Sequence, residues 1–311
     1  MKKRLLGMAL AAMMASSVSA AAAETPPLLI MPSPSAAKEA VILYTNDVHT
    51  YIDNTYTGAD GTKGEGIRYS TVAALKDAFP EALLVDAGDH VQGTAYGSMD
   101  RGETVVALMN AAGYDVATLG NHEFDYGMDG LENIREWADY DYVSCNFYHT
   151  ETGNVLKPYQ VFEAAGMKIA FIGITTPESF NTSNPTYFQN EEGEFIYGIT
   201  GRESGSALYA AVQKAIDAAA EEADVIIALG HLGDDASSDP WNSEDVIANT
   251  AGLDAFIDAH SHSTVESKAV ADKNGDTVWL TQTGEYFNAV GKMTVSADGT
   301  ITTELLLRGS G

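Results

Sequence analysis

The sequence predicts an α/β domain with a largely buried sheet, and two observations support this fold class. Short runs of β-branched and aliphatic residues alternate with alanine-rich stretches of helical periodicity, the pattern of strands joined by helices. Several of the apolar runs also end in Asp, Asn or His. Because the carboxyl ends of strands in an open α/β sheet face one ligand-binding crevice, these side chains are expected to meet.

The expected elements follow from this alternation of apolar patterns. Helical spacing of apolar residues predicts helices at 71–79, 104–112, 131–138 and 207–222. Short β-branched runs predict strands at 41–45, 82–85, 115–118, 142–145, 169–174, 225–229 and 255–257.

Two later regions have a different character. The segment 179–205 is rich in Asn, Thr, Gly and Glu, and is expected to be a long surface excursion rather than part of the core. Asn274-Gly275 and Asp298-Gly299 stand between β-prone runs and predict hairpin turns.

Length and composition limit the kind of protein. The 311 residues include 17 Lys plus Arg and 44 Asp plus Glu, a formal charge of −27, with 45% hydrophobic residues. This apolar content is sufficient for a packed core and excludes a disordered polyanion. Such negative charge repels nucleic acids and anionic lipids, so neither is expected as a partner. Bound cations can still reverse the charge inside a site.

The first residues predict a secretory signal. Lys2, Lys3 and Arg4 precede an apolar run over 5–15, and small residues follow up to Ala23. This order predicts a signal peptide at 1–23, cleaved after Ala20 or Ala23, and a secreted or periplasmic protein without a membrane contact thereafter. An uncleaved membrane anchor is the alternative. Residues 24–40, rich in Pro and Ala, are expected to be a linker, and 41–311 one catalytic domain.

Metal-ligand side chains follow five of the expected strands. The only cysteine, Cys145, cannot form a disulfide or a thiolate metal site, so any ligands must be oxygen and nitrogen. Imidazole, carboxylate and amide oxygen suit zinc, manganese or iron. Each motif alone is equally compatible with a capped turn or a solvated loop, but five in register favour a metal site. The residues are Asp47 and His49, Asp89, Asn121 with His122 and Asp125, His231, and His260 with His262.

Eight segments carry a resemblance to a known family. The principal ones are TNDVHTYID at 45–53, LLVDAGDHVQGT at 83–94, ATLGNHEFDYG at 117–127, ALGHLG at 228–233 and DAFIDAHSHS at 254–263. EGIRYSTVAALK at 65–76, KIAFIGITTPES at 168–179 and WLTQTGEYFNAVGK at 279–292 add to them. Together they resemble the calcineurin-like metallophosphoesterases, and within these the secreted 5′-nucleotidase group that includes cyclic-nucleotide phosphodiesterases. The resemblance implies a β-sandwich flanked by helices, a four-layer α/β/β/α arrangement.

The resemblance also implies two divalent metal ions bridged by one carboxylate, Asp89. The other ligands of the first ion would be Asp47, His49 and His262, and those of the second Asn121, His231 and His260. The usual glycine before the last motif is Ala259 here, which adds only a methyl group.

The implied reaction is phosphoester hydrolysis of a nucleotide by a metal-bridging hydroxide, of the 5′-nucleotidase or 2′,3′-cyclic phosphodiesterase type. His122 is left as a non-ligand beside the reaction centre, with Asp125 fixing its orientation. The alternatives are a nucleotide-sugar or pyrophosphate hydrolase, or a non-catalytic metal- or ligand-binding protein. The His122–Asp125 pair favours catalysis, because metal capture does not need it.

Other properties are left open. Full-length members usually continue into a C-terminal domain that holds the nucleoside; none is expected before Gly311, so the base is not predicted. His90 could reach substrate or pack within its turn, and Asp86 could support a ligand or cap a turn. Arg68 could neutralise phosphate or form a surface ion pair. The sequence does not indicate the metal or the oligomeric state.

Overall fold

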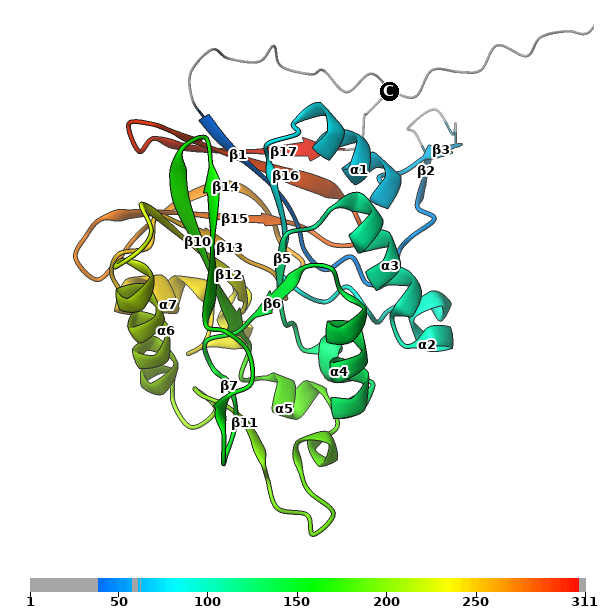
Figure 1. The fold of residues 1–311 in the computed structure, drawn as a ribbon, viewed down its shortest axis with the longest axis vertical. Helices are drawn as coiled ribbons and strands as arrows, with labels where there is room; N and C mark the ends of the chain where they lie inside the picture. Colours follow the sequence, from blue (N-terminus) through cyan, green and yellow to red (C-terminus); the bar gives the residue numbers. More distant parts are fainter. Residues whose placement is uncertain (1–38, 58–60, 62, 308–311) are drawn as a thin grey trace, which may run out of the picture.

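A computed structural model describes residues 39–57, 61 and 63–307. Two six-stranded sheets pack face to face, and helices cover their outer surfaces, which confirms the four-layer arrangement (Figure 1). The predicted signal peptide and most of the predicted linker lie outside the described residues. Glu39 and Ala40, assigned to the linker, are instead the first residues of β1.

The first sheet has the order β17-β16-β1-β4-β5-β6. Its last four strands are parallel, whereas β16 pairs antiparallel with β1 and β17 antiparallel with β16. The bounds are β1 Glu39–Thr45, β4 Leu83–Asp86, β5 Val116–Thr118, β6 Asp141–Val143, β16 Ala289–Ser296 and β17 Ile301–Leu307.

The second sheet has the order β14-β15-β13-β12-β10-β9, with four parallel strands between antiparallel edges. The residues alone predicted one buried sheet, whereas the same strands divide between two sheets. Both faces of each sheet are apolar, so one face packs on the other sheet and the opposite face on helices. The bounds are β9 Tyr159–Ala164, β10 Met167–Thr175, β12 Val225–His231, β13 Ala255–Ile257, β14 Thr264–Ala271 and β15 Thr277–Thr283.

Side-chain alternation builds three core layers. In β1, Ile42 and Tyr44 point between the sheets, where they join Phe171 and Ile227 of the second sheet. Leu43, one residue along, points to the helices on the opposite face. Apolar side chains therefore fill the space between the two sheets. The ends of the strands lie outside this packing and are continued by loops.

The helices divide between the two outer faces. α1 (Tyr69–Ala78), α3 (Glu103–Ala112) and α4 (Gly127–Trp137) cover the first sheet. α6 (Gly205–Ala219) and α7 (Ser243–Asn249) cover the second (Figure 1). The four predicted helices are present, although α4 begins four residues before the expected start. The shorter elements, not predicted, are β2 Thr55–Thr57, β3 Lys63–Glu65, α2 Ala95–Asp100, η1 His122–Phe124, β7 Phe147–His149, β8 Gly153–Asn154, α5 Ser179–Thr182, η2 Pro185–Phe188, β11 Tyr197–Ile199 and η3 Ala236–Ser238.

The segment 179–205 runs largely over the surface, as predicted, but it is anchored in the core. Phe180, Phe188 and Ile199 are buried in the core that lies under α4. Ser183 donates a hydrogen bond of 2.8 Å to the backbone carbonyl of Asn121. The sequence did not predict this anchoring, in which a few apolar side chains hold an otherwise polar segment against the functional loops.

The two predicted hairpins are present. Antiparallel pairing joins β14 to β15 and β16 to β17. In the first turn the Asp272 carboxylate accepts hydrogen bonds from the backbone N–H groups of Asn274 and Asp276. Asp298 similarly accepts from Thr300 in the second turn.

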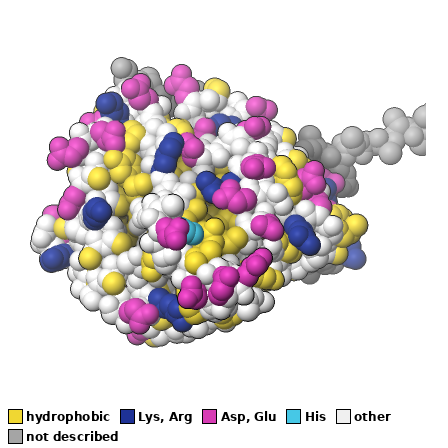
Figure 2. All heavy atoms as spheres, turned by 60° about the horizontal axis from the view of Figure 1, so that its bottom comes forward, with side chains coloured by type: hydrophobic (Ala, Val, Ile, Leu, Met, Phe, Trp, Pro, Cys, Tyr) yellow, Lys and Arg dark blue, Asp and Glu magenta, His cyan; other side chains and the backbone are white. Residues whose placement is uncertain are grey.

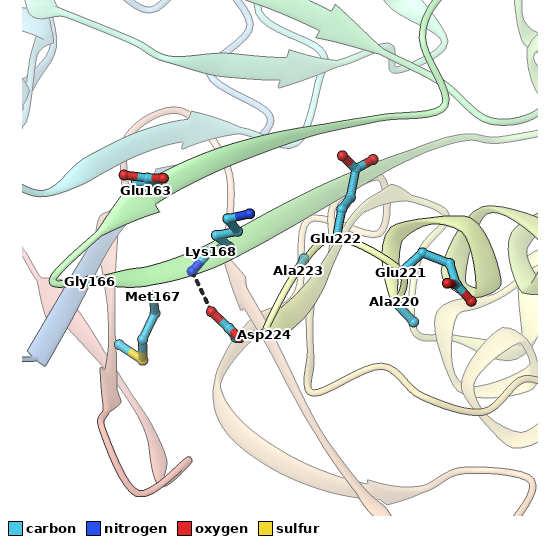
Figure 3. A pocket seen from close by; sticks show the side chains of 9 residues that line it. All are labelled: Glu163, Gly166, Met167, Lys168, Ala220, Glu221, Glu222, Ala223 and Asp224. Carbon is cyan, nitrogen blue, oxygen red and sulfur yellow. Dashed lines mark hydrogen bonds between the residues drawn. The ribbon is translucent and has the colours of Figure 1, made fainter.

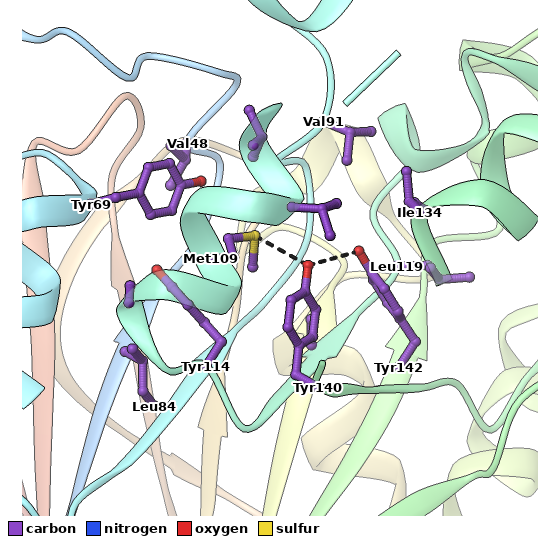
Figure 4. Close-up of a cluster of buried hydrophobic side chains, with 14 of the residues drawn as sticks. Val48, Tyr69, Leu84, Val91, Met109, Tyr114, Leu119, Ile134, Tyr140 and Tyr142 are labelled. Carbon is purple, nitrogen blue, oxygen red and sulfur yellow. Dashed lines mark hydrogen bonds between the residues drawn. The ribbon is translucent and has the colours of Figure 1, made fainter. Parts of the chain in front are cut away.

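Buried tyrosines under the helices form a hydrogen-bonded chain (Figure 4). The Tyr140 hydroxyl lies 3.1 Å from that of Tyr142 and 3.3 Å from the Met109 sulfur. The Tyr142 hydroxyl also lies 2.7 Å from Nε2 of His90, in the loop after β4. These contacts provide polar partners inside an apolar layer, where unpaired hydroxyls would be costly. Cys145 is buried but lies two residues past the end of β6, not inside the strand as expected.

Candidate metal centre

The side chains singled out in the sequence meet at the carboxyl ends of strands from both sheets. β1, β4 and β5 of the first sheet lead to Asp47, Asp89 and Asn121, and β13 of the second leads to His260. His231 is the last residue of β12 rather than a loop residue. The crevice therefore lies at the junction of two sheets and not along the edge of one.

The predicted ligands of the first ion lie within reach of one another. Nε2 of His49 lies 3.2 Å from Nε2 of His262, 3.8 Å from Asp47 Oδ1 and 3.7 Å from Asp89 Oδ2. Nε2 of His262 is 3.5 Å from Asp47 Oδ1. Donor atoms of Asp47, His49 and His262 thus lie mutually close, as a bound cation requires, and Asp89 Oδ2 lies beside His49.

The second predicted set also converges, at Asp89, His231 and His260. Nε2 of His231 lies 3.1 Å from Asp89 Oδ2, and His260 offers a ring nitrogen to the same group. Nε2 of His231 and Oδ1 of Asn121 are buried without a hydrogen-bond partner. Unpaired buried acceptors are rare, and a cation is a partner that both atoms can bind. The residues present therefore fit two divalent ions that share Asp89.

The backbone of this centre adopts unusual conformations. A positive φ is uncommon for residues other than glycine and costs about 1–3 kcal/mol each, a strain that typically occurs at functional sites. Five predicted ligands have it: Asp47 (48°), His49 (49°), Asp89 (60°), His260 (79°) and His262 (57°).

Two glycines, Gly88 and Gly120, allow the loops to approach each other. A Cβ on Gly88 would lie 2.5 Å from the backbone nitrogen of Gly120. A Cβ on Gly120 would lie 2.2 Å from Oδ1 of Asp89. Only hydrogen fits at either position, so both glycines keep the Asp89 loop in place.

Three acidic residues that the sequence did not single out hold the centre together. The buried Glu123 carboxylate accepts backbone hydrogen bonds from Asp89, His90 and Gly120 at 2.9, 2.9 and 2.6 Å. Glu178 and Glu285 each contact a histidine of the last motif. All three lie inside the segments that carry the family resemblance, which was the only available signal.

His122 and Asp125 form the predicted pair. Nδ1 of His122 lies 2.6 Å from Asp125 Oδ2, and the ring meets that of His49 edge-on, with centroids 5.1 Å apart. His122 also belongs to a group of possible metal-binding side chains with His49 and Asp89. Of its side chain, 29% is exposed, so it borders both the centre and solvent.

The carboxylates dominate the electrostatics. Burial lowers the pKa of His122, but the hydrogen bond to Asp125 and the charge of Asp89 raise it to about 9. Burial likewise lowers the pKa of His231, but Asp89 and Asp47 raise it to about 10. Burial raises the pKa of Asp89, whereas His231 and its neighbours hold it well below its usual range. The same negative charge attracts divalent cations.

The structure decides between the open alternatives for three other residues. His90 is buried with Nδ1 2.9 Å from Asp86 Oδ1, so it packs locally. Asp86 also accepts from the backbone N–H of Gly88, which caps the turn before Asp89. Arg68 pairs with Glu65 at 3.3 Å on the surface and does not belong to the centre.

The surface outside the candidate metal centre has a further hollow and scattered acidic side chains. A hollow between the β9–β10 hairpin and the end of α6 is lined by Glu163, Lys168, Glu222 and Asp224 (Figure 3). It contains none of the predicted site residues. Acidic side chains spread across the face drawn in Figure 2 rather than gathering in one patch. In the part of the chain that the structure describes, none of the helices is long and apolar enough to cross a membrane.

The chain is similar to known proteins over most of its length. Residues 81–278 match the family model described as bacterial capsule synthesis protein PGA_cap. A snake venom 5′-nucleotidase of Gloydius brevicauda is 30% identical over 240 residues, 72% of this chain and 37% of that protein.

Two solved structures have a similar fold at 25% identity. A 5′-nucleotidase precursor from Thermus thermophilus gives a TM-score of 0.74 over 87% of this chain and 54% of that one. The calcineurin-like phosphoesterase YfkN from Bacillus subtilis gives 0.66 over 86% of this chain and 91% of that one. The chain thus spans about a third to a half of the venom and Thermus proteins.

Proposed function

The chain belongs to the PGA_cap/calcineurin-like phosphoesterase family, and on this premise we propose that it is a metal-dependent hydrolase of phosphoesters. One observation supports this activity above the others. Two convergent ligand sets share Asp89, and the His122–Asp125 pair lies beside them. We propose that the seven ligands hold two divalent ions: Asp47, His49, Asp89, Asn121, His231, His260 and His262.

The metal ligands and His122 would have separate roles in the reaction. Bound divalent ions would activate water and neutralise the phosphate charge. His122 would keep a proton on Nε2 and donate it to the leaving oxygen, because Asp125 accepts the Nδ1–H. Its partial exposure leaves room for a substrate between the ring and solvent.

A non-catalytic metal-binding protein is the second candidate. Its ligands would be the same, and the unpaired atoms of His231 and Asn121 would be explained equally well. It would not need a histidine oriented by a carboxylate at the edge of the centre. The His122–Asp125 pair therefore favours the hydrolase.

We further propose that the substrates are nucleotides. Relatives that are named 5′-nucleotidases support nucleotides as the substrate class. We propose that these are 5′-monoesters or 2′,3′-cyclic phosphates. Nucleotide sugars and pyrophosphates share the same phosphate chemistry and are the alternatives.

We also propose that the protein is secreted or periplasmic. The signal peptide proposed at 1–23 predicts a mature chain that starts after Ala20 or Ala23. Sequencing the N-terminus of the exported protein tests this.

A phosphate-release assay with added manganese or zinc tests the activity. We expect release from a 5′-nucleotide or, with a coupled phosphomonoesterase, from a 2′,3′-cyclic nucleotide. Nucleotide sugars and inorganic pyrophosphate are assayed alongside to define the class. A protein that binds two metal ions but hydrolyses none of these substrates would contradict the hydrolase and support the second candidate.

A further inference from the structure

The histidines of the centre each use one ring nitrogen for a protein contact. Nδ1 of His49 lies 3.0 Å from the backbone carbonyl of Gln92, and Nδ1 of His231 lies 2.8 Å from that of Ala87. A carbonyl oxygen can only accept, so both rings carry their proton on Nδ1. In each ring Nε2 is then left as the metal-facing atom.

The histidines of the last motif have carboxylate partners instead. Nδ1 of His262 contacts Oε2 of Glu285, which again leaves Nε2 toward the centre. His260 is reversed: its Nε2 lies 2.8 Å from Oε2 of Glu178. Only Nδ1 of His260 is then left for the group that it forms with Asp89 and His231.

Glu178 is itself held in place. It follows β10 directly before α5, and its side chain is 21% exposed. The same oxygen that contacts His260 accepts a hydrogen bond of 3.0 Å from the Ser238 hydroxyl. Glu178 thus comes from the segment after β10, and Ser238 at the end of η3 holds its carboxylate by this hydrogen bond. Together they fix the carboxylate relative to the His260 ring.

We propose that Glu178 is a positioning residue that keeps the His260 proton on Nε2 and thereby presents Nδ1 to the second metal ion. His49, His231 and His262 would bind through Nε2. This inference rests on the metal centre of the proposed function and adds which atom of each ring binds. A carboxylate partner both orients a ligating histidine and increases its basicity, and its loss typically lowers metal affinity about 10–100-fold.

Zinc affinity tests the proposal without any turnover. In the Glu178→Gln variant the side-chain amide can donate as well as accept, so the His260 proton is free to move to Nδ1. We expect its weaker zinc site to lose affinity about 10–100-fold in a competition titration. Glu136→Gln, an exposed change on α4, is the matched control and should bind as the wild type does. Equal affinity in a folded Glu178→Gln protein would overturn the proposal.

A second readout needs only the wild type, so it survives a variant that fails to fold. In ¹⁵N long-range spectra of the zinc-loaded protein, we expect the proton on Nε2 of His260 and on Nδ1 of the other three histidines. A proton on Nδ1 of His260 would overturn the proposal. If the expected pattern is found but no phosphoester is hydrolysed, the proposed reaction fails and this inference stands.

Discussion

The carboxylate of Glu123 accepts a hydrogen bond of 2.9 Å from the backbone N–H of Asp89. Glu123 follows β5, whereas Asp89 follows β4, so the contact joins two loops of the metal centre. The backbone N–H groups of His90 and Gly120 donate to the same carboxylate. A single buried acid thus holds Asp89, the proposed bridging ligand, in its strained conformation.

Glu123→Ala is expected to destabilise the fold. Three buried N–H groups would lose their acceptor, and unsatisfied buried donors cost about 1–3 kcal/mol each, so we expect a loss of about 3 kcal/mol or more. Urea unfolding measures it. The exposed Glu132→Ala on α4 is the control and should change stability by less than about 0.5 kcal/mol. Equal midpoints for the two variants would contradict the role of Glu123.

His122→Ala is expected to lower kcat about 10²–10⁴-fold, because a proton donor at the leaving oxygen is lost. Bound metal, measured by elemental analysis, should stay at the wild-type level, since His122 is not among the proposed ligands. Asp125→Asn should lower kcat by a smaller factor, because the ring remains but is less firmly oriented. Unchanged turnover, or loss of a metal ion with His122, would disprove this assignment.

Gly120→Ala is expected to weaken metal binding. The new Cβ would lie 2.2 Å from Oδ1 of Asp89, so this carboxylate, which we propose to bridge the metal ions, must move. Gly153→Ala is a useful comparison, because nothing lies within 4 Å of its Cβ and only its positive φ of 83° adds strain. Zinc titration should show a loss for Gly120→Ala alone. Equal affinities would show that the loop can accommodate a methyl group.

Cys145 is expected to be unreactive in the native chain. Burial raises the pKa of its thiol to about 12, so only about one molecule in 10,000 carries the thiolate at pH 8. A colorimetric thiol reagent should therefore react slowly at pH 8 and pH 9, and rapidly once urea unfolds the protein. Because the sequence has one cysteine, the signal is unambiguous. Rapid reaction of the folded protein would contradict the burial.

The strands could be predicted because their apolar runs are local. Their partition into two sheets could be predicted only from the family resemblance, since β1 pairs with β16 across almost the whole domain. The anchoring of the segment 179–205 could not be predicted for a similar reason. Its composition is polar, and the burial of Phe180 and Phe188 depends on Phe124 of η1, which contacts Phe188, and on the stacking of Phe180 on Phe188.

The candidate ligands could be predicted because each follows a strand within a short motif. Their supporting residues could not be identified in the same way. Glu178 meets His260 across 82 positions of sequence, and the contact depends on how the β10 and β13 ends lie together. Glu123 stands beside His122 in the sequence, yet its role comes from backbone groups of another loop.

The most direct test of the central claim is the rate of phosphate release from a 5′-nucleotide during a manganese titration. The metal-free chain is held at a concentration well above the dissociation constants of its metal sites, and Mn²⁺ is added stepwise. Two ions sharing Asp89 predict that the rate rises to a plateau at two equivalents per chain, and that Asp89→Asn stays inactive throughout. A plateau at one equivalent, or activity in Asp89→Asn equal to that of the wild type, would contradict the two-metal centre.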